Sequence, residues 1–358
     1  MRNLIKTFLV LLSVFCGQFI FGQSSNEKLR EAINLMDSGK IDESITILEQ
    51  EKKNDPNRFD YSYELAYAYY LKNNFKKSIS ILEKIKNHQF VTDRLFQLLG
   101  NSYDNIKKSK KAIDIYKSGL KRFPNSGNLY LELGVMHLND KDLNVALSYF
   151  EKGIEVAPSF PSNYYWTSKI FCKSTEEVWG MIYGEIFMNL ERNSKRTEEI
   201  SKLLFDTYKS EIKFTSENSF SVSFSKNSTV NINDILNPGS VKLPFGVGVY
   251  EPTLMFSIVS EKTININSLN VIRKNFIDNY YSRNFDKTYP NILFTYQKKV
   301  KDAGHLEAYN HWILMKGDED GFDNWMNSNQ EKWDNFVEWF TNNEMIVDEN
   351  NKFTRMQY

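Results

Sequence analysis

Residues 127–160 have the sequence GNLYLELGVMHLNDKDLNVALSYFEKGIEVAPSF, and the same pattern recurs upstream at a spacing of 34 residues. Three sets of equivalent positions recur at this spacing. The first is a leucine followed by a small residue, at Leu65-Ala66, Leu99-Gly100 and Leu133-Gly134. The others are the small residues Ser78, Ala112 and Ala146 and the large residues Leu82, Tyr116 and Phe150. A fixed period of this length indicates one supersecondary unit stacked on copies of itself.

The residue types at the repeated positions favour a pair of packed helices. Small residues such as Gly134 and Ala146 let two helices approach closely, and large residues at helical spacing fill the space between them. Pro124 and Pro158 lack an N–H and clash with a helical continuation, so each is expected to end a second helix. One such unit leaves an apolar face uncovered, which predicts that neighbouring units stack.

At these positions the chain resembles the tetratricopeptide repeat (TPR), a helix–turn–helix unit of 34 residues. Four copies cover residues 25–158, at about 25–58, 59–92, 93–126 and 127–160. The first copy departs most from the pattern, with Glu31 where leucine is expected, and the second has Phe90 in place of the closing proline. The resemblance implies an α-solenoid, a right-handed superhelix of helical hairpins.

The amino terminus is typical of an exported protein. Residues 1–22 are predicted to be a secretory signal peptide, with basic Arg2 and Lys6 followed by a short apolar core. The alternative is an uncleaved anchor, although the apolar run is short for a membrane span. We therefore expect an exported protein, periplasmic or associated with the outer membrane after cleavage.

Charge and cysteine content narrow the function classes. The chain carries 45 basic and 45 acidic residues, so its formal charge gives no general case for a nucleic-acid partner. Cleavage of the leader would leave Cys172 as the single cysteine, which cannot form an internal disulfide. Its apolar helical context favours packing over a reactive thiol.

Beyond the repeats the period fades, although helical patterns continue. Residues 161–211 are predicted to form a degenerate fifth repeat and a capping helix, with Gly180 and Gly184 at close-contact positions. Residues 212–345 are expected to form a mostly helical α+β domain. Its small β-hairpin should pair the alternating segment Phe220, Val222 and Phe224 with Val230 and Ile232. Residues 346–358 are expected to be a frayed tail, and the whole fold is mainly α.

The search for catalytic, cofactor-binding or metal-binding motifs identifies none. His305 and His311 are six residues apart, unlike the i, i+4 pair that binds zinc from one helix. Residues 318–323, DEDGFD, superficially suggest a calcium loop, but Gly321 comes too early, so a helix-capping turn is favoured. No cofactor is predicted.

The family resemblance assigns a protein-binding groove to the first helix of each repeat. The corresponding residues run from aromatic through amide to aliphatic: Tyr63, Tyr67, Tyr70, Gln97, Asn101, Asn105, Leu131 and Val135. Tyrosine offers broad apolar contact plus a hydrogen bond, and asparagine can bond an extended backbone. We expect a peptide or partner helix to bind there. The alternative is that these residues pack against the second domain.

Three functions remain open. The favoured one is a non-catalytic protein-interaction scaffold or adaptor of the bacterial cell envelope, with a protein or peptide partner and no nucleic acid or small-molecule cofactor. A second is a hydrolase-like enzyme whose catalysis resides in residues 212–345, with the repeats recruiting substrate; its candidates are His305, Glu307 and His311 with Asp318 or Asp320. A third is a purely structural role within an envelope complex.

Overall fold

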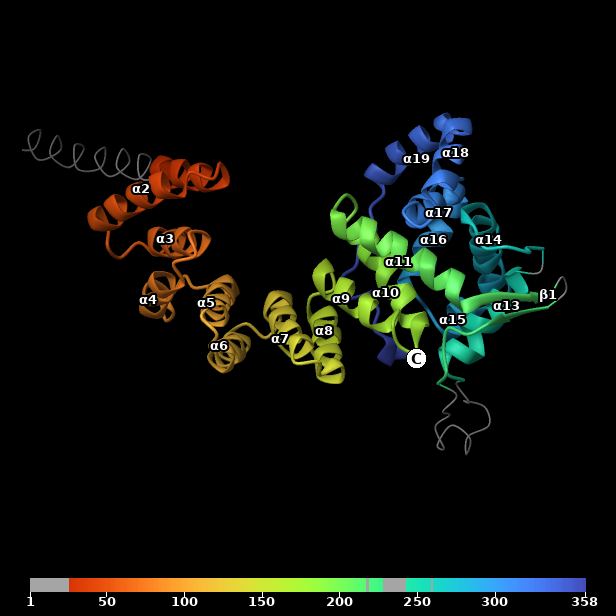
Figure 1. Cartoon of the computed structure of the whole chain (residues 1–358), viewed down its shortest axis with the longest axis horizontal. Helices are drawn as coiled ribbons and strands as arrows, with labels where there is room; N and C mark the ends of the chain where they lie inside the picture. The colour runs from red at the N-terminus through yellow and green to blue at the C-terminus, as the bar shows by residue number, and fades with distance from the viewer. Residues whose placement is uncertain (1–25, 217–218, 228–242, 259) are drawn as a thin grey trace, which may run out of the picture. The chain divides into compact units, whose positions relative to one another are not determined.

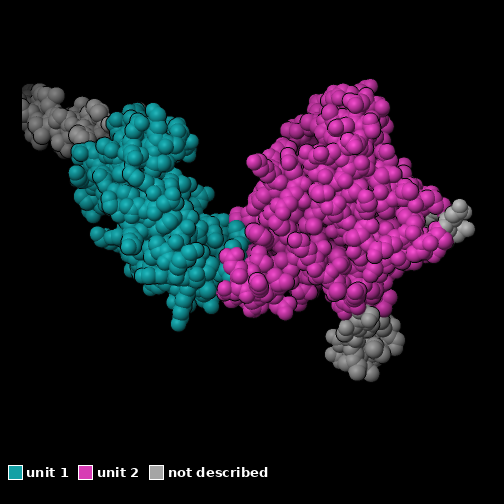
Figure 2. Space-filling model, in the orientation of Figure 1, with its two compact units in different colours: residues 1–136 teal, residues 137–358 magenta. Residues whose placement is uncertain are grey.

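The computed structural model describes residues 26–216, 219–227, 243–258 and 260–358. The predicted mainly α fold is confirmed (Figure 1). The chain divides into two compact units, Met1–Met136 (unit 1) and His137–Tyr358 (unit 2), coloured separately in Figure 2. The predicted signal peptide, residues 1–22, lies outside the described residues. No helix of the described part is both long and apolar enough to cross a bilayer.

Unit 1 is built from helical hairpins that follow the predicted period. A helix at residues 26–37 is followed by α2 (Ile41–Asn54), α3 (Phe59–Leu71), α4 (Phe75–Ile85), α5 (Asp93–Asn105), α6 (Ser109–Arg122) and α7 (Gly127–Asn139). Consecutive helices pack on one another from α2 to α6. The first hairpins share a core of Ala32, Met36, Ile45, Leu48, Tyr61, Leu65, Ala68 and Tyr69.

The turn inside each hairpin has the same backbone conformation. Gly39, Asn73, Lys107 and Lys141 all have positive φ, at 77°, 60°, 62° and 62°. These residues are 34 positions apart, so the period visible in the side chains also exists in the dihedral angles. Residues other than glycine enter this left-handed region at a small energetic cost, which the packed helices on either side must offset.

Glycines set the distance between neighbouring helices of unit 1. A Cβ atom at Gly100 would overlap the Tyr116 ring of α6. A Cβ atom at Gly119 would lie 2.7 Å from both the Phe96 Cβ atom of α5 and the Leu129 Cδ1 atom of α7. Gly100, identified from the sequence, and Gly119 are therefore points of close approach among α5, α6 and α7.

Unit 2 continues with helices and one small sheet. Its elements are α8 (Leu143–Val156), α9 (Pro161–Phe171), α10 (Glu177–Leu190), α11 (Lys195–Glu211), β1 (Ile212–Ser216), β2 (Ser219–Val222), the π-helical turn η1 (Gly246–Tyr250), α13 (Glu251–Ile258), α14 (Ile266–Ser282), α15 (Phe285–Thr288), α16 (Ile292–Asp302), α17 (Leu306–Leu314), α18 (Glu319–Ser328), α19 (Gln330–Asn342) and the 3-10 turn η2 (Arg355–Gln357).

Helix α10 is the centre of unit 2. Every residue from Val178 to Asn189 is buried, and α9, α11 and α16 pack around the helix. Gly180 and Gly184 permit the close contact with α9, because a Cβ atom at either position would lie 2.5 Å from Cys172 N or Ser168 Oγ. One apolar core extends from Ile154 to Phe353, so residues 161–211 and the expected domain 212–345 share a single core.

The β-hairpin exists, but its strands differ from those predicted. β2 pairs antiparallel with β1, which precedes it, in the register Ile212↔Val222 and Phe214↔Phe220. Ile212 and Phe214 alternate with polar residues directly after α11, where no strand was expected. The predicted partner, Val230 and Ile232, lies outside the described residues. Phe224 continues past the strand into the core, where its carbonyl accepts a hydrogen bond from Val178 N at 3.0 Å.

The carboxy-terminal segment is packed, in contrast to the frayed tail expected for residues 346–358. Val347 and Phe353 are buried, and the Tyr358 ring stacks on Phe245 with centroids 4.6 Å apart. The Arg355 guanidinium pairs with the Glu151 carboxylate of α8 at 2.6 Å. The polar residues 348–351 only form a turn between these apolar contacts, which explains why composition suggested fraying.

Candidate functional site

A concavity on the first helices of unit 1 contains most of the predicted groove. It has a volume of about 390 Å³ and is lined by Tyr63, Glu64, Tyr67, Tyr70, Arg94, Gln97, Leu98 and Asn101. Five of the eight predicted groove residues therefore line one surface, three from α3 and two from α5. We call it the α3–α5 concavity.

Helical spacing explains why these side chains share a face. Tyr63, Tyr67 and Tyr70 stand at positions i, i+4 and i+7 of α3, while Leu65 and Tyr69 point into the core of the stack. Tyr67 keeps 38% of its surface exposed although it is a large aromatic residue. The packing of α3 thus leaves a tyrosine face available for contact.

The two amides of α5 are already engaged with a neighbouring repeat. Gln97 Nε2 donates to Glu132 Oε1 at 2.7 Å, and Asn101 Nδ2 approaches the same oxygen at 3.4 Å. The Tyr116 hydroxyl donates to Asn101 Oδ1 at 2.5 Å. Asn101 was expected to bond a peptide backbone, but in the free chain its N–H group, like that of Gln97, donates to Glu132.

Sequence reasoning missed Glu132 as a member of this network. It is the one carboxylate of α7, in the segment GNLYLELGVMHLN, and stands directly after the predicted groove residue Leu131. A single acid in a mostly apolar helix was the available signal. Leu131 and Val135 themselves are half-buried on α7 and do not line the concavity.

Asn105 extends the polar edge of the concavity. Its side-chain amide donates to the Asn101 carbonyl at 2.8 Å and approaches the Tyr70 hydroxyl at 3.4 Å. Asn105 is an exposed residue.

Two carboxyl groups on this face have raised pKa values. Burial raises the pKa of Glu64, repulsion from Asp60 adds to the rise, and the nearby Arg94 opposes it. Burial also raises the pKa of Glu132, against the hydrogen bonds from Gln97 and Asn101. Within the described part of the chain, Glu64 and Arg94 have no hydrogen-bond partner, so both can engage a ligand.

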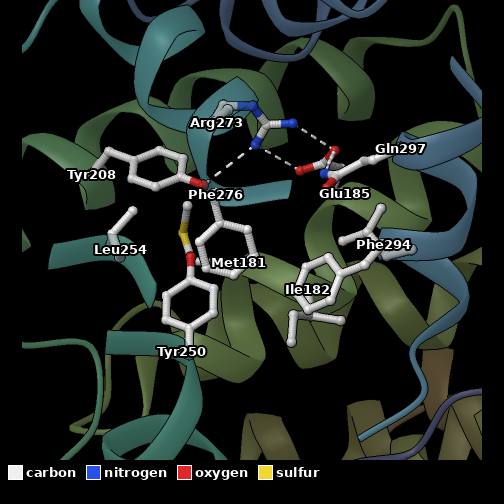
Figure 3. A pocket seen from close by; sticks show the side chains of 11 residues that line it. Met181, Ile182, Glu185, Tyr208, Tyr250, Leu254, Arg273, Phe276, Phe294 and Gln297 are labelled. Atoms are coloured by element: carbon white, nitrogen blue, oxygen red, sulfur yellow. Dashed lines mark hydrogen bonds and ion pairs between the residues drawn. The ribbon is translucent and has the colours of Figure 1, made fainter. Parts of the chain in front are cut away.

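The second candidate site is a buried polar network at the centre of unit 2. The Arg273 guanidinium donates to both Glu185 oxygens, at 2.8 and 2.7 Å (Figure 3). The same carboxylate accepts from the Gln297 amide at 2.5 Å and from the Tyr309 hydroxyl at 2.8 Å. Arg273 Nε donates to Asn310 Oδ1 at 2.8 Å.

The cavity beside this network is too small for a substrate. Its volume is about 20 Å³, and Tyr208, Tyr250 and Phe276 are among the residues that close it (Figure 3). That volume holds about one water molecule. Arg273 and Glu185 are each at most 5% exposed, and each guanidinium nitrogen donates to a partner. The network therefore joins α10, α14, α16 and α17 and supplies no open reaction site.

The residues named for the enzyme hypothesis have other contacts. The His311 ring stacks on Trp325 with centroids 4.1 Å apart, and its Nδ1 and Nε2 atoms lie 2.8 Å from Glu307 O and 3.2 Å from Asn267 Oδ1. Burial lowers the His311 pKa, so the ring is neutral near pH 7. The His305 ring packs on Trp339, at 5.2 Å.

The acidic candidates are likewise engaged. Glu307 accepts from Trp325 Nε1 at 2.8 Å and pairs with Lys332 at 3.0 Å. Asp318 caps α18 by accepting from Gly321 N at 3.2 Å, which is the capping turn favoured from the sequence. Asp320 follows in the first turn of α18. Among the described residues, no group of three His, Cys, Asp or Glu side chains is arranged to hold a metal ion.

Comparison with known families identifies the repeats. Models of the tetratricopeptide repeat match residues 29–89, 96–126 and 127–160. These segments contain the hairpins described above, so the hairpins between residues 29 and 160 are tetratricopeptide repeats. Repeats of this family are generally found in protein-interaction scaffolds.

Several solved structures resemble part of the chain. MamA is 19% identical, with 45% of this chain and 94% of that chain covered and a TM-score of 0.38. Pseudomonas aeruginosa pilF is 17% identical over 52% and 84%, with a TM-score of 0.45. TTC0263, a TPR protein of Thermus thermophilus, is 12% identical over 50% and 98%, with a TM-score of 0.43. No curated protein matches the sequence.

Proposed function

We propose that this protein is a non-catalytic adaptor of the bacterial cell envelope that binds a peptide or helical segment in the α3–α5 concavity. The observation that carries the proposal is the concavity itself, in which three tyrosines surround a carboxylate and a guanidinium that have no hydrogen-bond partner among the described residues. Tyrosine and arginine are the residue types that contribute most to protein interfaces.

The geometry favours a segment that contributes at least one apolar side chain. Tyr67 and Leu71 are 38% and 37% exposed and stand one turn apart on α3, so together they offer an apolar surface. Glu64 and Arg94 can then pair with polar groups of the segment. Gln97 and Asn101 would take part by keeping Glu132 in place, or by exchanging that bond for one to the ligand.

The envelope location and the absence of catalysis belong to the same proposal. Residues 1–22 have the composition of an export signal, which supports the location. The contacts of His305, Glu307 and His311 support a structural role for unit 2, because each side chain packs on an aromatic ring or has a partner. The proposal requires no cofactor and no nucleic acid.

A site-specific cross-link tests the proposed groove. A photoreactive residue in place of Tyr67 should capture a defined protein partner in intact cells, because this position lines the concavity. The matched control is the same residue in place of Phe256, an aromatic side chain of α13 that is 54% exposed. Tyr67→Ala should weaken binding of the captured partner at least about tenfold, as expected for an interface tyrosine. Equal capture from positions 67 and 256 would refute the groove.

A further inference from the structure

The helices of unit 1 differ sharply in charge. α4 with Lys86, and α6 with Lys107 and Lys108, contain eleven lysines and arginines but two acids, Glu83 and Asp114. The first helices α3, α5 and α7 show the opposite balance, with five acids and Arg94 as their one strong base. We call the cationic residues of segments 76–86 and 107–122 the basic face.

This excess is specific to the second and third repeats. α2 holds the same place in the first repeat, and it has four acids and two lysines. α8 holds that place in the fourth repeat, and it has two acids and one lysine. A general need to solvate the outer helices would have made all four alike, so the concentration of positive charge on α4 and α6 calls for another explanation.

Contacts join the two helices into one surface. The Arg122 guanidinium at the end of α6 donates to the carbonyls of Lys86 and His88, just after α4, at 3.4 and 3.2 Å. Lys111 of α6 lies over the Tyr103 ring, whose hydroxyl donates to Glu83 of α4 at 2.8 Å. Glu83 also pairs with Lys86 at 2.6 Å, so one of the two acids is already neutralised.

Most of the charge on α6 is uncompensated. Lys110, Lys117 and Lys121 are exposed and stand on one face, at spacings of seven and four residues. In the described part of the chain these three ammonium groups have no hydrogen-bond or ion-pair partner. Burial lowers the pKa of Lys52 beside α4, and repulsion from Lys84 adds to the shift.

An exposed aromatic residue stands at the edge of the basic face. Phe90, in the loop between α4 and α5, is 65% exposed, and its ring is 5.5 Å from that of His88. The carbonyl of His88 accepts the hydrogen bond from Arg122 described above. Phe90 is therefore an uncovered apolar side chain beside cations. It also occupies the position at which the sequence lacks the closing proline of the repeat.

We propose that the basic face binds an anionic lipid surface, with Phe90 entering the headgroup region. Each lysine near such a surface adds its own increment to the free energy of binding. An exposed aromatic ring adds to this by burying apolar area at the boundary between headgroups and acyl chains. Nucleic acid fits less well, because the other aromatic residues of α4 and α6, Phe75 and Tyr116, are buried or half-buried, which leaves one ring for stacking. The basic face shares no residue with the α3–α5 concavity.

Vesicle sedimentation of the full chain tests this inference. Vesicles containing about 30% phosphatidylglycerol should bind the protein more tightly than pure phosphatidylcholine vesicles, and the difference should disappear at high salt. Insertion of any apolar segment would occur in both vesicle types, so the difference isolates the charge. Lys110→Gln, Lys117→Gln and Lys121→Gln combined should reduce anionic binding by about a hundredfold, since each lysine contributes about fivefold.

The matched control changes the same charge on another helix. Lys195, Lys202 and Lys209 of α11 are also exposed and share one face, at spacings of seven residues. Converting all three to glutamine should leave anionic binding within about twofold, and Phe90→Ser should weaken it without changing the salt dependence. The inference fails if the α11 control weakens binding as much as the α6 triple variant. It also fails if the protein binds a single-stranded oligonucleotide but no anionic vesicles.

Discussion

The two units of the molecule are stabilised over different distances along the chain. In unit 1, side-chain hydrogen bonds connect residues about one repeat apart, as from Gln97 to Glu132 and from Asn105 to Tyr70, both 35 positions. In unit 2, Glu185 bonds Arg273 and Tyr309 at separations of 88 and 124 positions. Unit 1 is therefore a sum of nearest-neighbour contacts, whereas unit 2 depends on one assembled centre.

The unfolding of the two units can be followed separately. All six tryptophans, from Trp166 to Trp339, lie in unit 2. Tryptophan fluorescence therefore reports the unfolding of unit 2 alone, and far-ultraviolet circular dichroism reports the helices of both units. Recording both signals on one sample separates the two units.

The largest effect is expected for Arg273→Met. The change leaves the Glu185 carboxylate buried without its counter-ion, which should destabilise unit 2 by about 3–5 kcal/mol. Urea denaturation followed by tryptophan fluorescence should show this loss, while the part of the dichroism signal that comes from the repeats keeps its midpoint. Lys298→Met, which removes an exposed i, i+4 pair with Asp302, should cost less than about 0.5 kcal/mol. If both variants behave alike, the buried pair does not organise unit 2.

An intermediate effect, confined to unit 1, is expected for Gly100→Ala. The added methyl group would overlap the Tyr116 ring, so α5 and α6 must separate or Tyr116 must move. Overpacking of this kind costs about 1–3 kcal/mol. Hydrogen exchange at α5 and α6 should accelerate, and tryptophan fluorescence should remain unchanged. The exposed Ser118→Ala serves as the control on α6. A matching shift of the tryptophan transition would show that the two units unfold together.

The smallest effect is a pH dependence that differs in sign between the units. His311 has a lowered pKa in the folded state, so its contribution to unit 2 is fully present above the unfolded value of about 6.5 and is lost as the pH falls below it. The loss is about 1.4 kcal/mol for each unit of pKa difference. Glu64 and Glu132 have raised values, so acidification removes an ionisation penalty from unit 1.

Urea midpoints measured between about pH 7.5 and 4.5 check this difference, because the histidine changes charge in the upper part of that range and the glutamates in the lower part. The tryptophan-reported midpoint should fall more steeply in the parent chain than in His311→Gln. The urea midpoint of the repeats, followed by circular dichroism, should rise as the pH falls. This rise should be smaller in Glu64→Gln than in the parent chain. A slope that His311→Gln leaves unaltered would show that this imidazole does not determine the pH response of unit 2.

The repeats were predictable because their information is periodic. A register set by Leu99, Gly100 and their equivalents places Tyr63, Tyr67 and Tyr70 on the same face as Gln97 and Asn101. The register fixes the orientation of a side chain but not its partner. It therefore missed that Glu132 occupies the amides of Gln97 and Asn101, a pairing that depends on side-chain lengths across two helices.

Unit 2 was less predictable because its contacts have no period. Nothing in the sequence connects Glu185 of α10 to Arg273 and Gln297, which lie 88 and 112 positions away. The alternation of apolar and polar residues identified the strand at Ser219–Val222. Its pairing partner depends on tertiary packing, and the observed partner is Ile212–Ser216. The carboxy-terminal contacts of Phe353 and Tyr358 escaped notice for the same reason, since isolated aromatic residues in a polar segment carry no pattern.

The left-handed turns have a consequence for how the array can begin to fold. Gly39, Asn73, Lys107 and Lys141 comprise three residue types, yet each reverses the chain through the same backbone conformation. Because that reversal needs only local sequence, every hairpin contains its own nucleus and none must wait for a particular neighbour. Glycine enters the left-handed region without strain and lysine does not, so the ease of nucleation should decrease from the first turn toward the later ones.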